Sequence, residues 1–558
     1  YRNVENTGRL IHMLSTYTYP KFEYRTPPEL NGKPKQRHPV VVIGAGPVGL
    51  ATAIDLAQQG LQVILLDDDD SVSVGSRGVC YAKRTLEVLD RLGCGQALVD
   101  KGVTWNVGRT FFDTEEVFNF DLLPDAGHER PGMINLQQYY MEEFLVKRAT
   151  QLAAIDIRWK HKVSKIEPSK DGVIVFIDTP DGSFSIDADW LVVADGARSP
   201  VRRQLGLEID GKVFQDRFLI ADVVMKADFP AERWFWFDPP FHRNQSVLLH
   251  RQADSVWRID FQLGWDADPE EEKKPENVIP RIRAMLGDER EFELEWVSVY
   301  TFQCRRMQKF RHGRILFAGD SAHQVSPFGA RGGNSGIQDA DNLGWKLRAV
   351  VEGIASERLL DSYSDERGYA ADENLQNSTR STDFITPKSS TSKIFRNAVL
   401  DLAREHAFAR SLVNSGRLSV PAFLTESQLN TSDTDLFEGW MMPGAPMDDA
   451  PVQVNGLDTW LLRQVSNASH EFTLLIFGTN AIDLPELPWK VKVLRVIQRD
   501  GLSNPGDVVD TEGLVASRYD GRSGTVYLLR PDQHVAARWR NFDATALRNA
   551  LSKALCLI

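Results

Sequence analysis

The chain has 558 residues, of which 42% are hydrophobic and 25% charged, with a formal net charge of −12 at pH 7. This is the composition of a globular protein of about two to four domains. The negative charge argues against nucleic acid or an anionic membrane as the main partner, and no apolar run approaches the ~18 residues of a membrane-spanning helix. The four cysteines form no C-x-x-C pattern and no metal-ligand spacing, so we expect no disulfide framework, no bound metal and a reducing, cytoplasmic location.

The first 39 residues are rich in Pro, Tyr and charge and lack clear periodicity. We expect an extended N-terminal arm that lies on the main domain or on a neighbouring subunit. Because the first residue is Tyr, we also expect the natural N-terminus to lie upstream of it.

Residues 40–67 predict a buried strand, a glycine turn, a helix and a second strand that ends at Asp67. Gly44, Gly46 and Gly49 fit the pattern G-x-G-x-x-G. The missing Cβ atoms permit a sharp turn, a close approach of a pyrophosphate to the backbone, and tight packing of the helix on the strand. The helix N-terminus attracts phosphates. Asp67 can bind the adenosine ribose and would repel a 2′-phosphate. The segment therefore predicts a bound dinucleotide, FAD or NAD rather than NADP.

A glycine-rich turn and an amphipathic helix follow at residues 75–93. Arg77 and Arg84 could each contact a phosphate or only solvent, and we favour a phosphate for Arg77. A further amphipathic helix is predicted at residues 135–149, with Gln138 near its start.

The middle of the chain predicts that the dinucleotide-binding domain is interrupted by a separate sheet and then completed. Short strands separated by D-G turns at residues 157–193 lead to Asp195 and Gly196, which directly follow a buried strand. Residues 213–305 alternate as strands and predict a mostly antiparallel sheet, a natural wall for a ligand cavity. Residues 313–353 return to a buried strand, a glycine-rich loop and a helix.

The C-terminal part predicts a polar, mainly helical stretch, a Pro/Gly cluster and then a third α/β unit. The expected segments are the arm (1–39), the first part of the dinucleotide-binding domain (40–212), the sheet domain (213–305), the second part of the dinucleotide-binding domain (306–385), a helical connection (386–442) and the C-terminal unit (443–558).

The glycine-rich segment around Asp320 separates a flavin from a nicotinamide. Asp320 follows a predicted strand and can accept hydrogen bonds from a polyol chain such as ribityl. The loop at residues 328–336 then leads into a helix, whose free N–H groups could stabilise negative charge on a ring system. A reduced flavin carries such a charge and a nicotinamide does not. We expect the nearby His323 to be structural.

Three ordered motifs, at residues 44–49, 195–196 and 319–320, resemble those of the class A flavoprotein aromatic hydroxylases, whose type member is para-hydroxybenzoate hydroxylase. The length and the extra C-terminal unit are more similar to those of the 3-(3-hydroxyphenyl)propionate hydroxylase and phenol 2-monooxygenase branch. The resemblance covers about residues 40–380 and, weakly, 443–558. It implies an α/β fold in which a Rossmann-like FAD-binding domain is interrupted by an antiparallel β-sheet substrate domain. It also implies a thioredoxin-like C-terminal domain, which lacks C-x-x-C and so lacks disulfide chemistry.

The resemblance also implies roles for individual residues that match the family's motifs. In the flavin loop Arg331 replaces the family's glutamine, and it could add positive charge beside the flavin or point away into a salt bridge. Pro327 matches a proline that lines the ring cavity. The implied FAD-binding residues are Gly44, Gly46, Val48, Gly49, Asp67, Arg77, Gln138, Asp195, Asp320, Arg331, Gly333 and Asn334.

The implied activity is hydroxylation of a phenolic or heteroaromatic substrate in aromatic catabolism, with bound FAD, transient NAD(P)H and O₂, through a C4a-hydroperoxyflavin. The protein orients the substrate and excludes water, and we expect a base near the phenol. We also expect a homodimer or a higher homo-oligomer. The catalytic candidates are Pro327 and, on the sheet, Trp236, Gln245, His250, Arg258 and Asp260.

Strand alternation places Arg258 and Asp260 on one face of the sheet and Trp257, Ile259 and Phe261 on the other. One of these faces must meet the cavity. An isolated histidine such as His250 is more commonly solvent-facing or already hydrogen-bonded than a base.

Two other functions remain open. Flavin halogenases carry W-x-W-x-I-P, and residues 234–239 read Trp-Phe-Trp-Phe-Asp-Pro, a near match that we interpret as coincidence. A flavin-fold protein that binds a ligand without turnover is the second alternative.

Overall fold

The structure is a computed structural model that describes residues 15–32, 36–287, 289–413, 418–465, 471–479, 482–499, 501 and 504–558. Much of the expected arm lies outside these residues. Its described part runs extended over the first domain, where Tyr17 stacks on Tyr139 and Phe22 stacks on Trp159. This described part of the arm therefore packs on its own chain.

The first sheet has eight strands, and the order β18-β11-β1-β2-β8 forms its parallel centre. Its strands are β1 (Arg37–Ile43), β2 (Val63–Leu66), β8 (Ile155–Arg158), β9 (Lys162–Pro168), β10 (Val173–Thr179), β11 (Gly182–Val193), β17 (Arg311–His312) and β18 (Ile315–Phe317).

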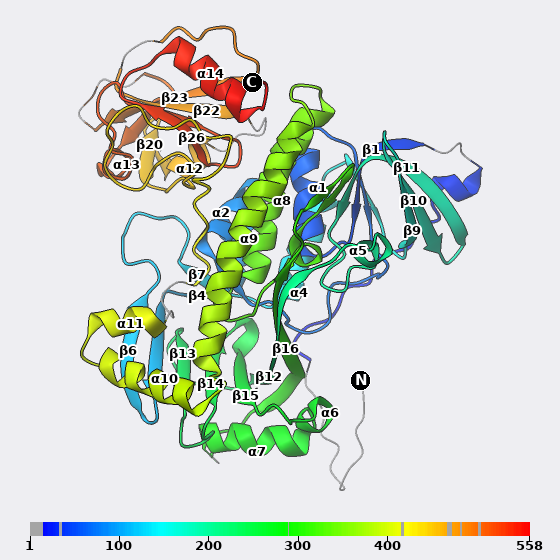
Figure 1. The fold of residues 1–558 in the computed structure, drawn as a ribbon, viewed down its shortest axis with the longest axis vertical. Helices are drawn as coiled ribbons and strands as arrows, with labels where there is room; N and C mark the ends of the chain where they lie inside the picture. The colour runs from blue at the N-terminus through cyan, green and yellow to red at the C-terminus, as the bar shows by residue number, and fades with distance from the viewer. Residues whose placement is uncertain are drawn as a thin grey trace.

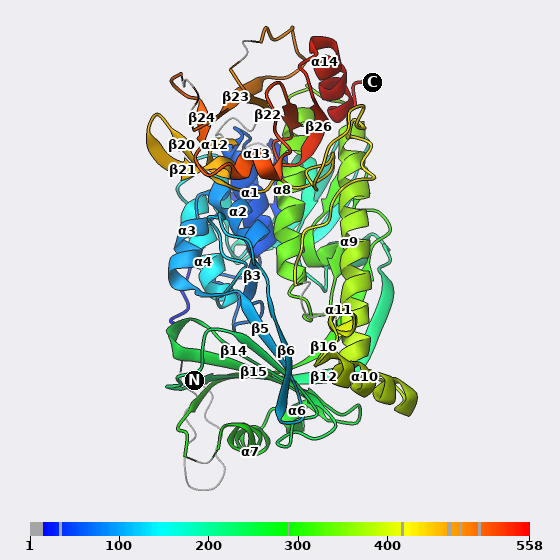
Figure 2. The ribbon, with the colours of Figure 1, turned by 90° about the vertical axis from the view of Figure 1, so that its left-hand side faces the viewer.

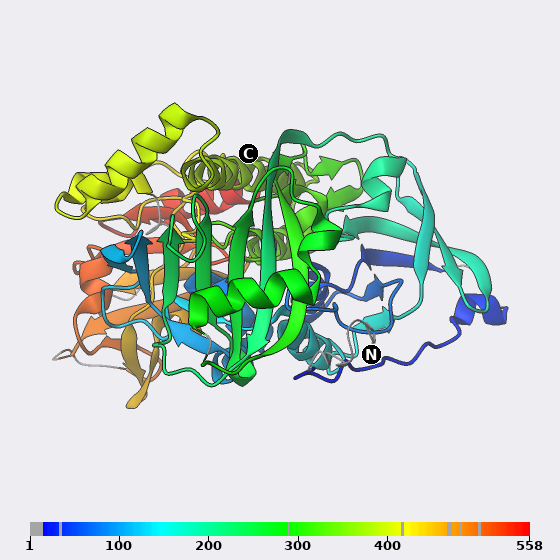
Figure 3. The same cartoon turned by 90° about the horizontal axis from the view of Figure 1, so that it is seen from below.

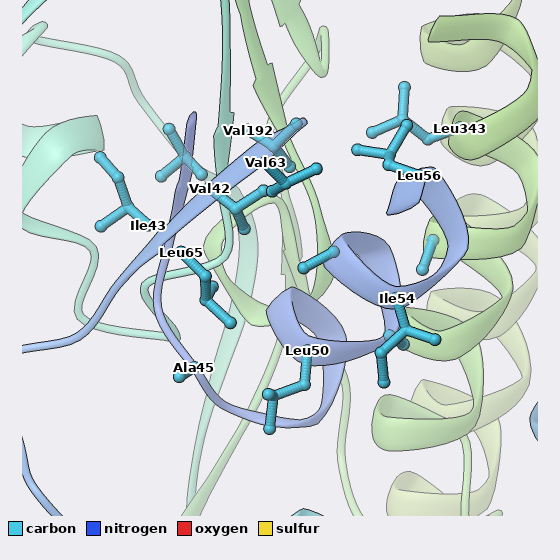
Figure 4. Close-up of a cluster of buried hydrophobic side chains, with 14 of the residues drawn as sticks. Val42, Ile43, Ala45, Leu50, Ile54, Leu56, Val63, Leu65, Val192 and Leu343 are labelled. Carbon is cyan, nitrogen blue, oxygen red and sulfur yellow. The ribbon is translucent and has the colours of Figure 1, made fainter. Parts of the chain in front are cut away.

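Helix α1 (Pro47–Gln58) connects β1 to β2, as parallel pairing requires. Side chains of β1, β2 and β11 such as Val42 and Val192 are fully buried, and each such burial contributes about 1.5–3 kcal/mol. Figure 4 shows these side chains beside α1, and Leu343 of α8 (Gly332–Val351) next to Leu56 on the other side of that helix. This core fixes the carboxyl ends of β1 and β11.

The second sheet has the order β19-β16-β12-β15-β14-β13-β5-β6, and its neighbours pair antiparallel except β13 and β5. Helix α7 (Pro275–Leu286) crosses its outer face (Figure 3). Its strands are β5 (Val107–Phe112), β6 (Glu115–Asp121), β12 (Asp210–Val224), β13 (Arg233–Phe237), β14 (Ser246–Arg251), β15 (Val256–Leu263), β16 (Glu293–Arg306) and β19 (His323–Gln324).

The sheet is wider than the range 213–305 expected for it, because the hairpin β5–β6 also belongs to it. β5 pairs with β13, more than 120 residues later in the chain. A pairing over that separation leaves no local trace in the sequence. A small third sheet has the order β3-β7-β4, and its strands are β3 (Cys80–Ala82), β4 (Val103–Trp105) and β7 (Met133–Asn135).

Helices α8 and α9 (Arg358–Ile385) pack side by side and run along the molecule from the C-terminal unit to the second sheet (Figures 1 and 2). The remaining helices of this part are α2 (Lys83–Leu92), α3 (Gly95–Lys101), α4 (Gln138–Ala149), α5 (Pro200–Gln204), α6 (Pro269–Glu272), α10 (Ser390–Ala403) and α11 (Ala407–Val413).

The expected helical connection at residues 386–442 is wrong beyond Val413. In the described residues 418–450 we find turns and extended chain without a helix. Pro421 and Pro443 cannot continue a helix, and Gly439 and Gly444 adopt φ values of +78° and +92°. These residues keep the segment extended on its way to the C-terminal unit.

The C-terminal unit contains a sheet with the order β21-β20-β24-β23-β22-β25-β26. Its elements are β20 (Pro451–Val454), β21 (Leu457–Trp460), α12 (Leu461–Val465), β22 (Phe472–Phe477), β23 (Val491–Gln498), β24 (Val508–Asp510), α13 (Leu514–Arg518), β25 (Val526–Leu529), β26 (Val535–Trp539) and α14 (Ala544–Ala554). The whole is a mixed α/β fold with several sheets. No helix among the described residues is long and apolar enough to cross a membrane.

Candidate functional site

A cavity of about 660 Å³ is lined by residues of both large sheets. It reaches from the carboxyl ends of β1, β2 and β11 to the inner face of the second sheet. The carboxyl edge of a parallel sheet is the usual place for a ligand in this architecture. The predicted FAD-binding residues all line this cavity except Gly49, and so do the catalytic candidates Pro327, His250, Arg258 and Asp260.

The glycine turn at the end of β1 forms one end of the cavity. Gly44 has φ +99°, and a Cβ there would lie 2.4 Å from the Ala194 carbonyl oxygen. A Cβ on Gly49 would lie 1.8 Å from the Gly44 oxygen, so this glycine packs inside the turn. At Gly46 a Cβ would meet nothing within 4 Å. Because Gly46 is also the N-cap of α1 and offers no side-chain cap, free N–H groups border an open space that suits phosphates.

Asp67 follows β2 and holds the turn from the side. Its Oδ2 accepts a hydrogen bond from Ala45 N at 2.5 Å, and its Oδ1 accepts one from Asp69 N at 2.8 Å. Burial raises the pKa of its carboxyl to about 6. A carboxylate has further lone pairs, so Asp67 can still accept hydrogen bonds from a ligand in the cavity.

The loop that carries Arg77 is held in place by two side chains. Gln138, the first residue of α4, accepts a hydrogen bond from Gly78 N at 3.0 Å. Arg258 donates through Nη1 to the Arg77 carbonyl oxygen at 2.9 Å. Arg77 itself has φ +31°, an unusual value for a residue with a side chain. The loop is thus fixed at the cavity from α4 and from the second sheet.

Two carboxylates, Asp195 and Asp320, line the cavity shortly after the ends of strands β11 and β18. Asp195 Oδ2 accepts a hydrogen bond from Val201 N at 3.3 Å, while its buried Oδ1 has no partner. Asp320 lines the cavity just after β18. Burial raises the pKa of both carboxyl groups above the ordinary value. Both are placed to accept hydrogen bonds from a ligand.

The N-terminus of α8 borders the cavity beside these carboxylates. Asn334 accepts a hydrogen bond from Ala82 N at 2.9 Å and donates to Cys80 O at 2.9 Å, which ties α8 to β3. Gly333 lines the cavity in the same turn. The buried Arg331 lines the cavity too, but its Nη1 donates to Asn374 of α9 at 3.0 Å. Its guanidinium therefore reaches towards α9.

The wall opposite the glycine turn is made by side chains of the second sheet. Arg258 and Asp260 line the cavity. Trp257, Ile259 and Phe261 pack on the other face in the core with α7. The inner face is therefore the one that carries the charged side chains. Trp236 and Gln245 do not line the cavity, and Trp236 stacks on Phe111 instead.

The wall is ordered in rows across the strands. Arg233 of β13, His250 of β14 and Arg258 of β15 lie opposite one another. The next row contains Leu248 and Asp260. Residues that face each other across neighbouring strands are about 5 Å apart at Cβ, so these polar groups form one cluster.

The histidine in this cluster is buried and lines the cavity, so, of the two expected alternatives to a base, a solvent-facing His250 is wrong. His250 is 2% exposed, its Nδ1 lies 3.8 Å from Cys80 Sγ, and its Nε2 has no partner. Burial and the neighbouring Arg258 and Arg233 lower its pKa well below 6.5. The ring is therefore neutral at pH 7, with a nitrogen free to bind a ligand.

The two charged residues next to His250, Arg258 and Asp260, differ in the hydrogen bonds that the protein gives them. Arg258 Nε donates to Asp222 Oδ1 at 2.9 Å, and its Nη2 contacts Ser76. Asp260 has a buried Oδ1 without a partner, and burial raises the pKa of its carboxyl to about 6. Arg258 is therefore held by the protein, and Asp260 is free to bind a ligand. Pro327 lines the cavity in the loop before α8.

Three other residues considered from the sequence lie outside the cavity. Arg84 is buried and donates to Asp532 O at 2.7 Å and to Gln533 Oε1 at 3.1 Å. It thus joins α2 to the C-terminal unit, and the expectation of a phosphate or solvent contact is wrong. Trp234 and Trp236, of the halogenase-like segment, pack on the outer face of the second sheet, which removes the geometric basis of that alternative.

Sequence reasoning missed Arg233, which lines the cavity at the start of β13. The signal was present in the sequence. In the run Arg-Trp-Phe-Trp-Phe, alternation puts the arginine on the same face as Phe235 and Phe237, and both phenylalanines belong to the buried inner cluster.

Comparisons with known proteins agree with this geometry. Residues 37–378 match the family model described as FAD binding domain. The 3-(3-hydroxy-phenyl)propionate/3-hydroxycinnamic acid hydroxylase of Mycolicibacterium smegmatis is 31% identical, over 59% of this chain and 58% of that protein. The para-nitrophenol 4-monooxygenase of Pseudomonas sp. (strain WBC-3) is 30% identical, over 59% of this chain and 82% of that protein. This chain thus spans less than two thirds of the first relative.

A solved structure shares the fold over almost the whole chain. The flavin-dependent monooxygenase PieE, crystallised with FAD and substrate, superimposes with a TM-score of 0.80 at 22% identity, covering 94% of this chain and 100% of that one. At this identity the likeness concerns the fold, and it extends through the C-terminal unit.

Proposed function

Because this chain belongs to the FAD-binding-domain family, we propose that it is an FAD-dependent monooxygenase that hydroxylates a phenolic or heteroaromatic substrate. NAD(P)H serves as a transient reductant and O₂ as the oxidant, in aromatic catabolism. One observation carries the proposal. A single cavity joins the glycine turn, Asp67, Asp195 and Asp320 to the polar wall of the second sheet.

The residues at the glycine end fit FAD. The open space at Gly46 and the uncapped start of α1 suit the pyrophosphate. Asp67 suits the adenosine ribose, and Asp195, with its unpartnered Oδ1, suits a hydroxyl donor. Asp320 would hold the ribityl chain, and the N-terminus of α8 would face the ring edge that becomes negative. When bound, FAD supplies the electron transfer and oxygen activation.

The wall of the second sheet would bind the substrate and handle its proton. We assign Asp260 as the proton acceptor for the substrate hydroxyl, since its Oδ1 has no partner and its pKa lies near 6. The neutral His250 is a hydrogen-bond partner in the same row. Arg258, neutralised by Asp222, holds the Arg77 loop and keeps the wall rigid. The apolar side chains of Phe218, Phe302 and Phe328 border the cavity and exclude water.

The remaining features of the proposal concern the whole chain. We take residues 443–558 to be a thioredoxin-like unit without disulfide chemistry, because the unit's single cysteine, Cys556, is buried and burial raises its pKa. All four cysteines of the chain are free, which supports a cytoplasmic location. A homodimer or a higher homo-oligomer is expected, and light scattering of the purified protein tests it.

The proposed function is tested with purified protein, a panel of phenols and hydroxylated aromatic acids, and NADH or NADPH. The expected result is bound flavin, oxidation of the reduced nicotinamide that the right aromatic stimulates, and a hydroxylated product. Bound flavin without substrate-stimulated oxidation would identify a binding protein. A chloride-dependent halogenated product would identify a halogenase.

A further inference from the structure

Arg233 differs from Arg258, the other arginine that lines the cavity from the second sheet. It lines the cavity, yet among the described residues no ion pair or hydrogen bond of its guanidinium is found. Its guanidinium carbon lies 5.8 Å from the centroid of the Phe235 ring. Arg258, two strands away in the same row, is fully engaged by Asp222, Ser76 and the Arg77 carbonyl.

None of the groups that face Arg233 forms an ion pair with its guanidinium. His250, opposite it on β14, is neutral. Cys80 on β3 is a protonated thiol, because burial raises its pKa to about 11. Asp260 on β15 acts on Arg233 through space without forming an ion pair with it. Burial accordingly lowers the pKa of Arg233 from its ordinary value.

A half-buried guanidinium without a partner is unfavourable, and titratable groups whose pKa is shifted are concentrated at functional sites. Its planar fork of N–H donors matches the two oxygens of a carboxylate, and it also binds a single anionic oxygen such as a phenolate. The position is right for a ligand, since Asp260, with its unpartnered Oδ1, lies in the adjacent row.

We propose that Arg233 is the anion-binding residue of the substrate subsite and that the substrate is an acidic aromatic compound. The anionic oxygens of the substrate bind the Arg233 guanidinium, and its hydroxyl group faces Asp260. This inference rests on the proposed function, because it treats the wall of the second sheet as the substrate end of the cavity.

The test uses the oxidised holoenzyme and does not require turnover. The change in flavin absorbance or fluorescence reports binding of 3-(3-hydroxyphenyl)propionate and of its neutral amide. The wild type is expected to bind the acid more tightly than the amide. Arg233→Gln is expected to weaken binding of the acid by roughly thirtyfold, because removing one partner of a buried charge pair has a cost of this size. The affinity for the amide is expected to stay almost unchanged.

Two variants serve as controls. Arg233→Lys keeps the charge and is expected to recover part of the preference for the acid. Arg243→Gln removes the same charge from the turn between β13 and β14, where Arg243 pairs with Asp113 outside the cavity, and is expected to bind both ligands like the wild type. All variants are expected to keep their flavin content, because Arg233 holds no other part of the protein.

A second ligand pair separates the two sources of negative charge. Para-nitrophenol, titrated below and above the pKa of its hydroxyl group, reports a phenolate. If Arg233→Gln weakens only its ionised form, the bound oxygen is a phenolate. If Arg233→Gln weakens the binding of 3-(3-hydroxyphenyl)propionate alone, the bound oxygens belong to a carboxylate.

Equal affinity of the wild type for acid and amide, with no dependence of para-nitrophenol binding on ionisation, would overturn the inference. So would a loss of both ligands together with the flavin in Arg233→Gln. The proposed function fails differently. In that case Arg233-dependent binding of the acid would remain, but no hydroxylated product would form from any aromatic compound with NAD(P)H and O₂.

Discussion

The two ends of the cavity are built from different parts of the chain. At the glycine end the surface is mainly backbone, formed by the turn at Gly46, the starts of α1 and α8, and the carboxylates that follow the strands. At the sheet end the surface is made of side chains, and Arg233, His250 and Arg258 reach it from three neighbouring strands.

This difference separates a general function from a specific one. Backbone N–H groups and a few carboxylates can bind a dinucleotide whatever the neighbouring residues are, because the ligand is always the same. The side chains at the sheet end can change without altering the fold, and in our proposal they set the choice of substrate. Changes at the glycine end should therefore affect flavin binding, and changes at the sheet end should affect substrate binding and rate.

The largest effect is expected from Gly49→Ala. Its Cβ would lie 1.8 Å from the Gly44 oxygen, which the turn cannot absorb, so the cost is on the order of 4 kcal/mol and bound flavin is lost. Flavin absorbance and circular dichroism check this result. In the matched variant Gly46→Ala the Cβ meets no protein atom, so the apoprotein should melt like the wild type while its affinity for FAD falls. Equal flavin content in all three proteins would contradict the assignment of the turn.

Asp320→Ala is expected to weaken FAD binding by roughly ten- to a hundredfold, the usual cost of losing a charge-assisted hydrogen bond. Titration of the apoprotein with FAD measures it. Asp361→Ala, which removes an exposed carboxylate of α9 that pairs with Arg311, is the control and should bind FAD normally. Full flavin affinity in Asp320→Ala would show that this carboxylate does not contact the cofactor.

Asp260→Asn tests the sheet end without disturbing the flavin. Hydroxylation is expected to fall by roughly a hundredfold, the contribution of one general base, with unchanged flavin content. The pKa of Asp260 is raised to about 6, and a base acts when deprotonated. The wild-type rate should therefore rise as the pH increases through about 6, and the variant should lack this rise. A variant that keeps the same pH profile would exclude Asp260 as the base.

The smallest effect is expected from Trp236→Phe. Trp236 stacks on Phe111 on the outer face of the sheet, so flavin binding and hydroxylation should both stay within about twofold of the wild type, as is usual for substitutions away from a site. Product analysis and flavin absorbance check this. A specific loss of product formation with normal flavin content would place Trp236 in the reaction and revive the halogenase alternative.

The same difference explains what the sequence could predict. The place of the glycine-end residues at the cavity was predictable from the sequence, because G-x-G-x-x-G, Asp67 and Asp320 lie within short segments that directly follow predicted strands. The sheet end was not. Strand alternation put Arg258 and Asp260 on one face but left open which face meets the cavity, and α7 on the outer face decides it.

Long-range pairing hid the rest of the site. His250 became a cavity residue only because β14 lies between β13 and β15, and β5 joins the sheet from a distant part of the chain. The sequence shows that residue 331 is a charged arginine, but it does not show where the side chain points. Its hydrogen bond to Asn374 depends on how α9 packs on α8. None of these contacts leaves a pattern within a short window of sequence.

The most direct test of the account is a turnover experiment with the purified protein in isotopically labelled dioxygen, with FAD and an acidic phenol present. We predict that the protein retains one flavin per chain and that one labelled oxygen atom appears in the hydroxylated aromatic product. A protein that takes up no flavin at saturating FAD, or a flavin-containing protein that yields no labelled product with any phenol, would contradict it.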